Sequence, residues 1–195
     1  MTRKLTVEDV LDLRAYERVR DDMRAEMLAV KRVRRVSLGT FITVCFENRD
    51  TVRYQIQEMA RVERLMTDEA IAEELRAYNP LIPEPGQLCA TLFIELTSDE
   101  AMREWLRRLA GIERHLLIRL ADGTEVRAVP EEQHASQLTR SDVTSAVHYF
   151  RFEFDAAQID GFAAGGASLV LDHPEYREDT DLSPATQSAL LSDLR

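Results

Sequence analysis

The sequence predicts an α+β fold with a largely antiparallel sheet of about five or six strands and helices packed mainly on one face. Helical and strand patterns occur in blocks, and not in the regular strand–helix alternation of parallel sheets. The segments "HLLIRL" and "TEVRAV" flank Asp122-Gly123, a turn that is typical of antiparallel hairpins. The 195 residues, 45% hydrophobic and 31% charged, suit a single domain spanning residues 1–195.

The N-terminal helical segment covers residues 6–35. Thr6 is a suitable N-cap for a first short helix. A longer helix follows over about residues 14–33, where apolar side chains recur every three or four positions: Tyr16, Val19, Met23, Met27 and Val30. This stripe could face the protein's own sheet or a second subunit, so a homo-oligomer is one possible assembly.

The segment "RDTVRYQIQEMARVERLM" carries two patterns at once. Val52, Tyr54 and Ile56 alternate with polar residues, as in a strand. Apolar residues also recur every three or four positions through Met66, as in a helix. Because the helical pattern persists and the alternation ends at Ile56, we predict a helix over residues 51–65 with Asp50 as its N-cap.

The remaining elements follow from β-branched and aromatic runs, capping residues and turn residues. The strands are expected in "FITVCFE", "LCATLFIEL", "SAVHYFRFEF" and "SLVLDH", besides the hairpin. Helices are expected over residues 68–78, 99–111 and 155–162, and a C-terminal helix over 184–194, where Pro184 occupies the favoured first position. Residues 130–142 are predicted to be a polar loop.

The charge disfavours two classes of function. A formal net charge of −10 opposes general binding to nucleic acids or anionic membranes, which need a positive surface. The basic run "KRVRR" is interpreted as cations at the end of a helix, where the helix dipole favours them. No segment has the roughly 20 apolar residues of a membrane span, and the N-terminus lacks a secretory signal, so a cytoplasmic location is expected.

The cysteines and histidines do not form known metal or redox motifs. Cys45 and Cys89 lie in separate apolar runs without CxxC spacing, so two buried reduced thiols are expected, with a disulfide between adjacent strands as the alternative. The four histidines are dispersed and match no ligand motif, so no metal is predicted. No glycine-rich nucleotide loop occurs, and no cofactor is predicted.

One polar constellation is a candidate pocket. At 100° per residue, Glu63 falls inside the apolar arc of the helix 51–65, and Gln55 falls at its side. A carboxylate directed inwards must be paired, hydrogen-bonded or protonated. Together with possible partners, the candidate pocket comprises Arg35, Gln55, Glu58, Glu63, His148 and Arg151. The alternative is a structural ion pair, or a Glu63 side chain that simply reaches solvent.

Several motifs together resemble a bacterial family known only as a domain of unknown function. They are "RRVSLG", "FENRDTVRYQIQEM", "YNPLIP", "ATLFIEL", "VHYFRF" and "HPEY", which cover almost the whole chain in order. Members of that family are often encoded near rubrerythrin-like proteins and iron–sulfur oxidoreductases. The resemblance therefore implies a redox or peroxide-stress setting and a protein partner of one of these kinds, but no catalytic residues.

Two hypotheses of function follow. The first is a non-enzymatic accessory or binding protein that associates with a redox partner. The second is an enzyme or small-ligand-binding protein in which Glu63 is the acid/base or ligand-pairing group, because a general base needs a perturbed carboxylate close to its substrate.

Overall fold

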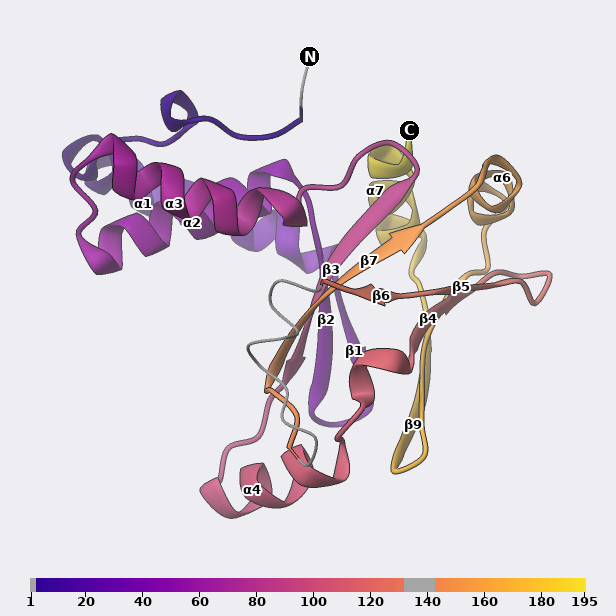
Figure 1. Cartoon of the computed structure of the whole chain (residues 1–195). Helices are drawn as coiled ribbons and strands as arrows, with labels where there is room; N and C mark the ends of the chain where they lie inside the picture. The colour runs from indigo at the N-terminus through magenta and orange to yellow at the C-terminus, as the bar shows by residue number, and fades with distance from the viewer. Residues whose placement is uncertain (1–2, 132–142) are drawn as a thin grey trace.

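The computed structural model describes residues 3–131 and 143–195 of the chain (Figure 1). The described α-helices are α1 (Leu13–Arg32), α2 (Arg49–Glu63), α3 (Asp68–Tyr78), α4 (Asp99–Arg108), α6 (Ala156–Ala163) and α7 (Pro184–Leu194). Short 3-10 turns are η1 (Val7–Asp9), η2 (Asn79–Leu81) and η3 (Ile112–Arg114). Most of the predicted loop 130–142 lies outside the described residues.

The strands form two antiparallel sheets. The first has the order β1-β2-β3-β7-β6, made of β1 (Arg35–Leu38), β2 (Ile42–Glu47), β3 (Gln87–Ile94), β7 (Val147–Glu153) and β6 (Val129–Pro130). The second has the order β5-β4-β8-β9, made of β5 (Glu125–Arg127), β4 (Leu116–Arg119), β8 (Ser168–His173) and β9 (Tyr176–Asp181). The predicted α+β class with antiparallel pairing is confirmed, and the strands divide between two sheets.

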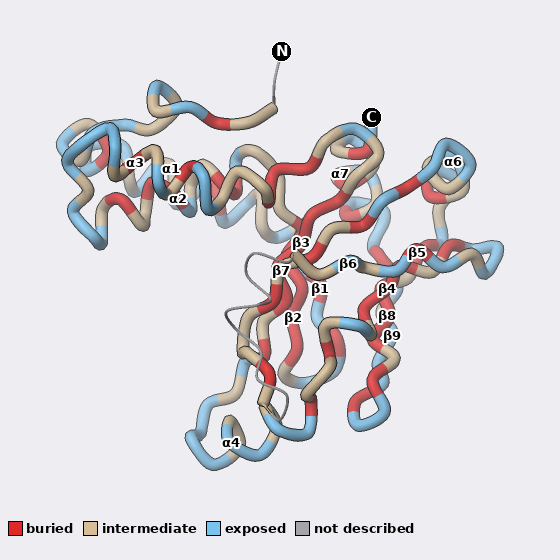
Figure 2. The backbone as a smooth tube through the Cα atoms, viewed as in Figure 1, coloured by how far each residue is buried: buried red, intermediate tan, exposed pale blue. Residues whose placement is uncertain are grey.

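The main hydrophobic core fills the space between the two sheets (Figure 2). Successive residues of a strand point to opposite faces, so the even-numbered residues of β2 and β7 face this core together. Phe46 and Phe152 meet there with ring centroids 6.2 Å apart. The second sheet contributes Ile118 and Leu171, both with 0% exposure. Burial of these side chains stabilises the fold by about 25 cal/mol per Å² of apolar surface.

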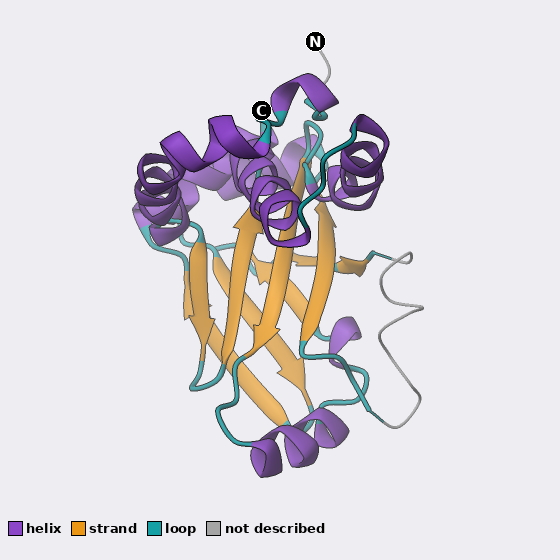
Figure 3. Cartoon of the chain, turned by 90° about the vertical axis from the view of Figure 1, so that its left-hand side faces the viewer, coloured by secondary structure: helices purple, strands orange, loops and turns teal. Residues whose placement is uncertain are grey.

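Helices α1, α2 and α3 form a separate layer at one end of the sheets, and α4 lies at the opposite end (Figure 3). This layer has its own apolar core, in which Val52, Ile56 and Ala60 of α2 pack with Ile71 and Leu75 of α3. No helix in the described ranges 3–131 and 143–195 is both long and apolar enough to cross a membrane.

The helix α2 confirms the helical interpretation of "RDTVRYQIQEM" but begins earlier than predicted. Asn48, and not Asp50, is the N-cap, since its side chain accepts from the Thr51 backbone N–H at 2.9 Å. Thr51 returns the bond by accepting from the Asn48 N–H at 2.9 Å, a reciprocal capping arrangement. The helix ends at Glu63 because Arg64 adopts a left-handed conformation with φ 55°.

Candidate functional site

A pocket of about 190 Å³ lies between the start of α2 and the face of the five-stranded sheet that is turned away from the main core. Residues that line it include Lys31, Arg35, Cys45, Glu47, Tyr78, Thr91 and Tyr149. Sites for drug-sized ligands begin at roughly 300 Å³. The pocket is therefore suited to a small molecule.

Strand register places the lining residues in one row across four strands. Arg35 lies opposite Cys45, Cys45 opposite Thr91, and Thr91 opposite Tyr149. Glu47 lies two residues beyond Cys45 and points to the same face, because side chains alternate along a strand. The pocket floor is thus a continuous patch of the sheet.

Glu47 is the acidic group of the floor and is half-buried. The Thr91 hydroxyl donates to one of its carboxylate oxygens at 2.7 Å, and the Thr51 hydroxyl donates to the other at 2.5 Å. A carboxylate has about four lone-pair positions, so Glu47 can accept further bonds. No cationic side chain in the described part of the chain forms an ion pair with Glu47.

Cys45 is a protonated thiol in the pocket floor. Burial, together with the nearby Glu47 carboxylate, raises its pKa to about 12. Burial likewise raises the pKa of Cys89 to about 12. Since the thiolate is the reactive form, neither group is suited to nucleophilic or disulfide-exchange chemistry at neutral pH.

The two thiols lie on the same face of adjacent strands but are not directly paired. Cys45 lies opposite Thr91, and Cys89 lies opposite Glu47, so the cysteines are diagonal neighbours. Diagonal neighbours have Cα atoms about 7–8 Å apart, beyond the roughly 7 Å limit for a disulfide. Both cysteines are free and buried, which confirms the expected reduced thiols.

Two cations line the pocket on the side of α1 and β1. The Lys31 ammonium lies 5.9 Å from the centre of the Tyr54 ring. The Arg35 guanidinium lies 5.6 Å from the centre of the Phe93 ring and 3.5 Å from the Glu95 carboxylate. The side chains of Arg35 and Glu95 are about half exposed, so this ion pair is weak and can exchange partners.

Two residues of the predicted pocket, Arg35 and Gln55, line the observed one. Gln55 shares the lining with Tyr78, and the pKa of the Tyr78 phenol is raised mainly by burial. Glu63 is exposed at the C-terminal end of α2, so the prediction that it points into the interior is wrong and the alternative, in which its side chain reaches solvent, is confirmed. The nearby Val62 is 67% exposed, which shows that the apolar arc does not reach this end of the helix.

Glu58 is part of a structural ion pair away from the pocket. It accepts from the Tyr16 hydroxyl at 2.6 Å and from two nitrogens of Arg20, each at 2.8 Å. The hydrogen bond from Arg20 is the main reason why the pKa of Glu58 falls to about 2. Glu58 therefore joins α1 to α2 and does not contribute to a ligand site.

His148 and Arg151 lie on opposite faces of β7. The buried His148 points towards the main core, where its Nε2 lies 2.9 Å from the Thr144 hydroxyl and 2.9 Å from the Ser145 carbonyl oxygen. Arg151 lies on the outer face and pairs with Glu153 at 3.0 Å. The structure therefore does not bring the six predicted residues together.

This chain is similar to a known protein family and to a solved structure. The DUF3501 family, described as a protein of unknown function, matches residues 4–194. The chain belongs to the DUF3501 family. A crystal structure of a novel protein of unknown function from Burkholderia pseudomallei K96243 is 37% identical, with a TM-score of 0.90, and the match covers 98% of this chain and 100% of that chain. The comparison with curated proteins found no match. The resemblance to a bacterial family of unknown function is confirmed, while the redox setting stays a prediction.

In this DUF3501 protein, sequence reasoning missed the central acidic residue, Glu47. The signal was present, because Thr43, Cys45 and Glu47 alternate with the apolar Val44 and Phe46 along one strand. Such alternation indicates one core face and one polar face. The prediction of a strand in "FITVCFE" did not include this polar face.

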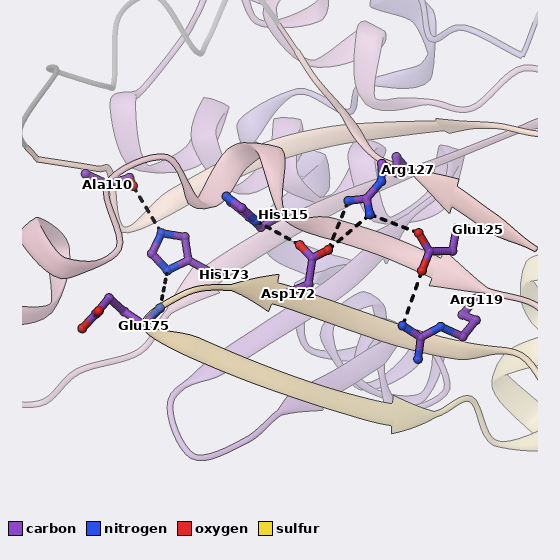
Figure 4. A network of polar contacts seen from close by, with 8 residues as sticks. All are labelled: Ala110, His115, Arg119, Glu125, Arg127, Asp172, His173 and Glu175. Carbon is purple, nitrogen blue, oxygen red and sulfur yellow. Dashed lines mark hydrogen bonds and ion pairs between the residues drawn. The ribbon is translucent and has the colours of Figure 1, made fainter. Parts of the chain in front are cut away.

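A second polar cluster lies on the outer surface of the four-stranded sheet (Figure 4). Asp172 is held between His115, at 3.0 Å, and Arg127, at 3.2 Å. Glu125 then pairs with Arg127 at 3.0 Å and with Arg119 at 3.5 Å. Because its charges already pair with one another, this cluster is a surface ion-pair network. Each ion pair of this type contributes little to the stability of the fold.

His173 extends this polar cluster towards α4. Its Nε2 donates to the Ala110 carbonyl oxygen at 3.2 Å, and its Nδ1 accepts from the Glu175 backbone N–H at 3.2 Å. Both ring nitrogens are therefore occupied. Within residues 3–131 and 143–195, no group of three or more His, Cys, Asp or Glu side chains is arranged to hold a metal ion.

Proposed function

We propose that this protein binds a small polar molecule and that the pocket around Glu47 is the binding site. The observation that carries the proposal is a half-buried carboxylate that opens into a cavity and has two hydroxyl donors but no cationic partner in the described residues. Carboxylates removed from water are normally paired. A bound ligand would supply the missing partner.

The surrounding residues support binding more than covalent chemistry. The only thiol of the pocket, Cys45, is held protonated by its environment. Burial also raises the pKa of the phenols of Tyr78 and Tyr149, so both remain hydrogen-bonding hydroxyls. Small-molecule sites typically combine such aromatic walls with a few fixed polar groups.

Native mass spectrometry of the protein isolated gently from its own host tests this proposal. We expect a bound small molecule that is lost from Cys45→Met, because the longer side chain enters the pocket without removing a hydrogen bond. The matched control is Cys89→Met, which changes an equally buried thiol outside the pocket lining. A bound molecule that survives Cys45→Met, or a chain that carries no small molecule, would contradict the proposal.

A second candidate function is that of a cytoplasmic, non-enzymatic accessory protein for a rubrerythrin-like or iron–sulfur partner. Two observations favour a role exerted through a partner. The protein's own thiols are protonated, and apolar side chains at the end of α2 are exposed, with Val62 at 67% and Met66 at 79%. Exposed apolar side chains are available for contact with a partner. Co-purification from the host that is abolished by the double substitution Val62→Ser and Met66→Ser would support this role, and a partner retained by that variant would refute it.

A further inference from the structure

The charged groups of the Glu47 pocket are arranged in an unusual way. Lys31 and Glu47 line the same cavity, yet they do not form an ion pair with each other. In the described part of the chain, Lys31 lies near no carboxylate within ion-pair distance, and its ammonium instead lies over the Tyr54 ring. In the described residues, the pocket therefore holds a cation and an anion that each lack an oppositely charged partner.

The positions of these charges follow from the sheet. Arg35 lies directly opposite Cys45, and Glu47 lies two residues further along the same strand as Cys45. Glu47 and Arg35 are thus diagonal neighbours, with Cα atoms about 7–8 Å apart. The electrostatic environment of the Cys45 thiol agrees, because Glu47 raises its pKa while Lys31 and Arg35 lower it.

We propose that the ligand is a small zwitterion of the amino-acid type, with an ammonium group bound by Glu47 and a carboxylate bound between Lys31 and Arg35. This inference rests on the proposed function of the pocket. It deepens that function by naming the charged groups of the ligand. The ligand's ammonium group is complementary to Glu47, and its carboxylate is complementary to Lys31. An ammonium group has three donors, which suits the open lone pairs of Glu47.

The size of the pocket supports this class of ligand. A volume of about 190 Å³ corresponds to roughly six water molecules at about 30 Å³ each. Such a space suits a molecule of about ten non-hydrogen atoms at most. Charge complementarity gives specificity more than affinity, so discrimination between charged and uncharged analogues is the appropriate readout.

The test is ligand-observed NMR followed by calorimetry on the full chain. The probes are the standard α-amino acids, with the larger ones expected not to fit, and the ω-amino acids from glycine to 6-aminohexanoate. For the best binder, the matched carboxylic acid without the amine and the matched amine without the acid are measured as well. We expect each one-charge analogue to bind at least about thirtyfold more weakly, since the loss of one partner of a desolvated charge pair typically costs that much or more.

Two variants show which side chain of the protein binds each charged end of the ligand. Glu47→Gln should weaken the amino acid strongly but leave the carboxylic acid analogue nearly unchanged. Lys31→Met should weaken the amino acid and leave the amine analogue unchanged. It should still fold, because in the described residues the Lys31 side chain forms no ion pair and gives up the contact with Tyr54 and a weakly favourable position at the end of α1. Glu63→Gln, on the same helix layer but exposed, is the control and should bind like the wild type.

The outcomes separate the two proposals. If no amino acid binds, or if a one-charge analogue binds as tightly as the zwitterion, the charge assignment is overturned. A different small molecule that is found bound and is lost in Cys45→Met would then leave the proposed pocket function standing. If no small molecule of any kind depends on the pocket, both proposals fail.

Discussion

The link between α1 and α2 through Glu58 allows a quantitative prediction about stability. The carboxylate of Glu58 receives a bidentate bond from Arg20 and a hydrogen bond from Tyr16. The substitution Glu58→Gln removes the charge but keeps nearly the same shape. It leaves the Arg20 guanidinium without its partner, so we expect the free energy of unfolding to fall.

The magnitude follows from the pKa of Glu58, which drops from 4.5 to about 2, mainly because of Arg20. At about 1.4 kcal/mol per pKa unit, this shift corresponds to roughly 3 kcal/mol at neutral pH. Both side chains are 23% exposed, and solvent screening reduces this value, so about 2 kcal/mol is expected. For a chain of this size, about 2 kcal/mol lowers the Tm by roughly 4–8 °C.

The pH dependence has a definite sign. Because the folded-state pKa of Glu58 is depressed, its contribution is fully present above about pH 4.5 and is lost as the pH falls towards about 2. Urea unfolding of the wild type and Glu58→Gln, followed by circular dichroism, should show a difference in stability near about pH 7 that narrows steadily below about pH 4. The control Glu63→Gln changes an exposed carboxylate in the same helix and should differ from the wild type by less than about 0.5 kcal/mol. Equal effects of the two substitutions, or a Glu58→Gln effect that is independent of pH, would refute the reasoning.

Three further predictions concern other buried groups. Asp193→Asn should lower the free energy of unfolding by about 3 kcal/mol, because Arg34, whose side chain is only 6% exposed, loses an ion-pair partner at 2.6 Å. Chemical denaturation measures this difference, and a change below about 1 kcal/mol would contradict the prediction. Cys45 and Cys89 should react with a thiol reagent far more slowly in the native protein than after denaturation, since their pKa is raised to about 12. Fast reaction of the native protein would contradict this prediction, because it would show that the thiols are accessible. Burial lowers the pKa of His148, so its ring should titrate below the ordinary value of 6.5 in NMR. Protonation of this buried ring should destabilise the fold as the pH falls below 6.5. A titration midpoint above 6.5 would be inconsistent with the buried position.

The helical periodicity of α2 predicted its buried residues only where the helix has neighbours. Val52 and Ile56 are buried as predicted, with 1% and 0% exposure. Val62 and Met66 follow the same spacing but are exposed, because the helix ends at Glu63 and no part of residues 3–131 and 143–195 buries these two side chains. A sequence pattern gives the direction of a side chain on its helix, but the packing partner decides whether that direction is the interior.

The buried amide of α2 illustrates a contact that the sequence could not reveal. Gln57 is fully buried, and its side chain accepts from the Leu11 backbone N–H at 2.9 Å and donates to the Leu11 carbonyl oxygen at 2.8 Å. The partner is a backbone 46 residues away in the chain. Helical periodicity does not include such partners, so the pattern of α2 does not single out Gln57.

The strands contained more information about the site than the helix did. On β7, the alternation alone places His148 and Arg151 on opposite faces, three residues apart, so a single pocket could not include both. On β2, the same rule places Cys45 and Glu47 together on the face away from the main core. The antiparallel register then brings Arg35 of one neighbouring strand and Thr91 of the other beside Cys45. A polar residue on the outer face of an otherwise apolar central strand is therefore the feature that locates the pocket, and it requires the register of three strands to become a site.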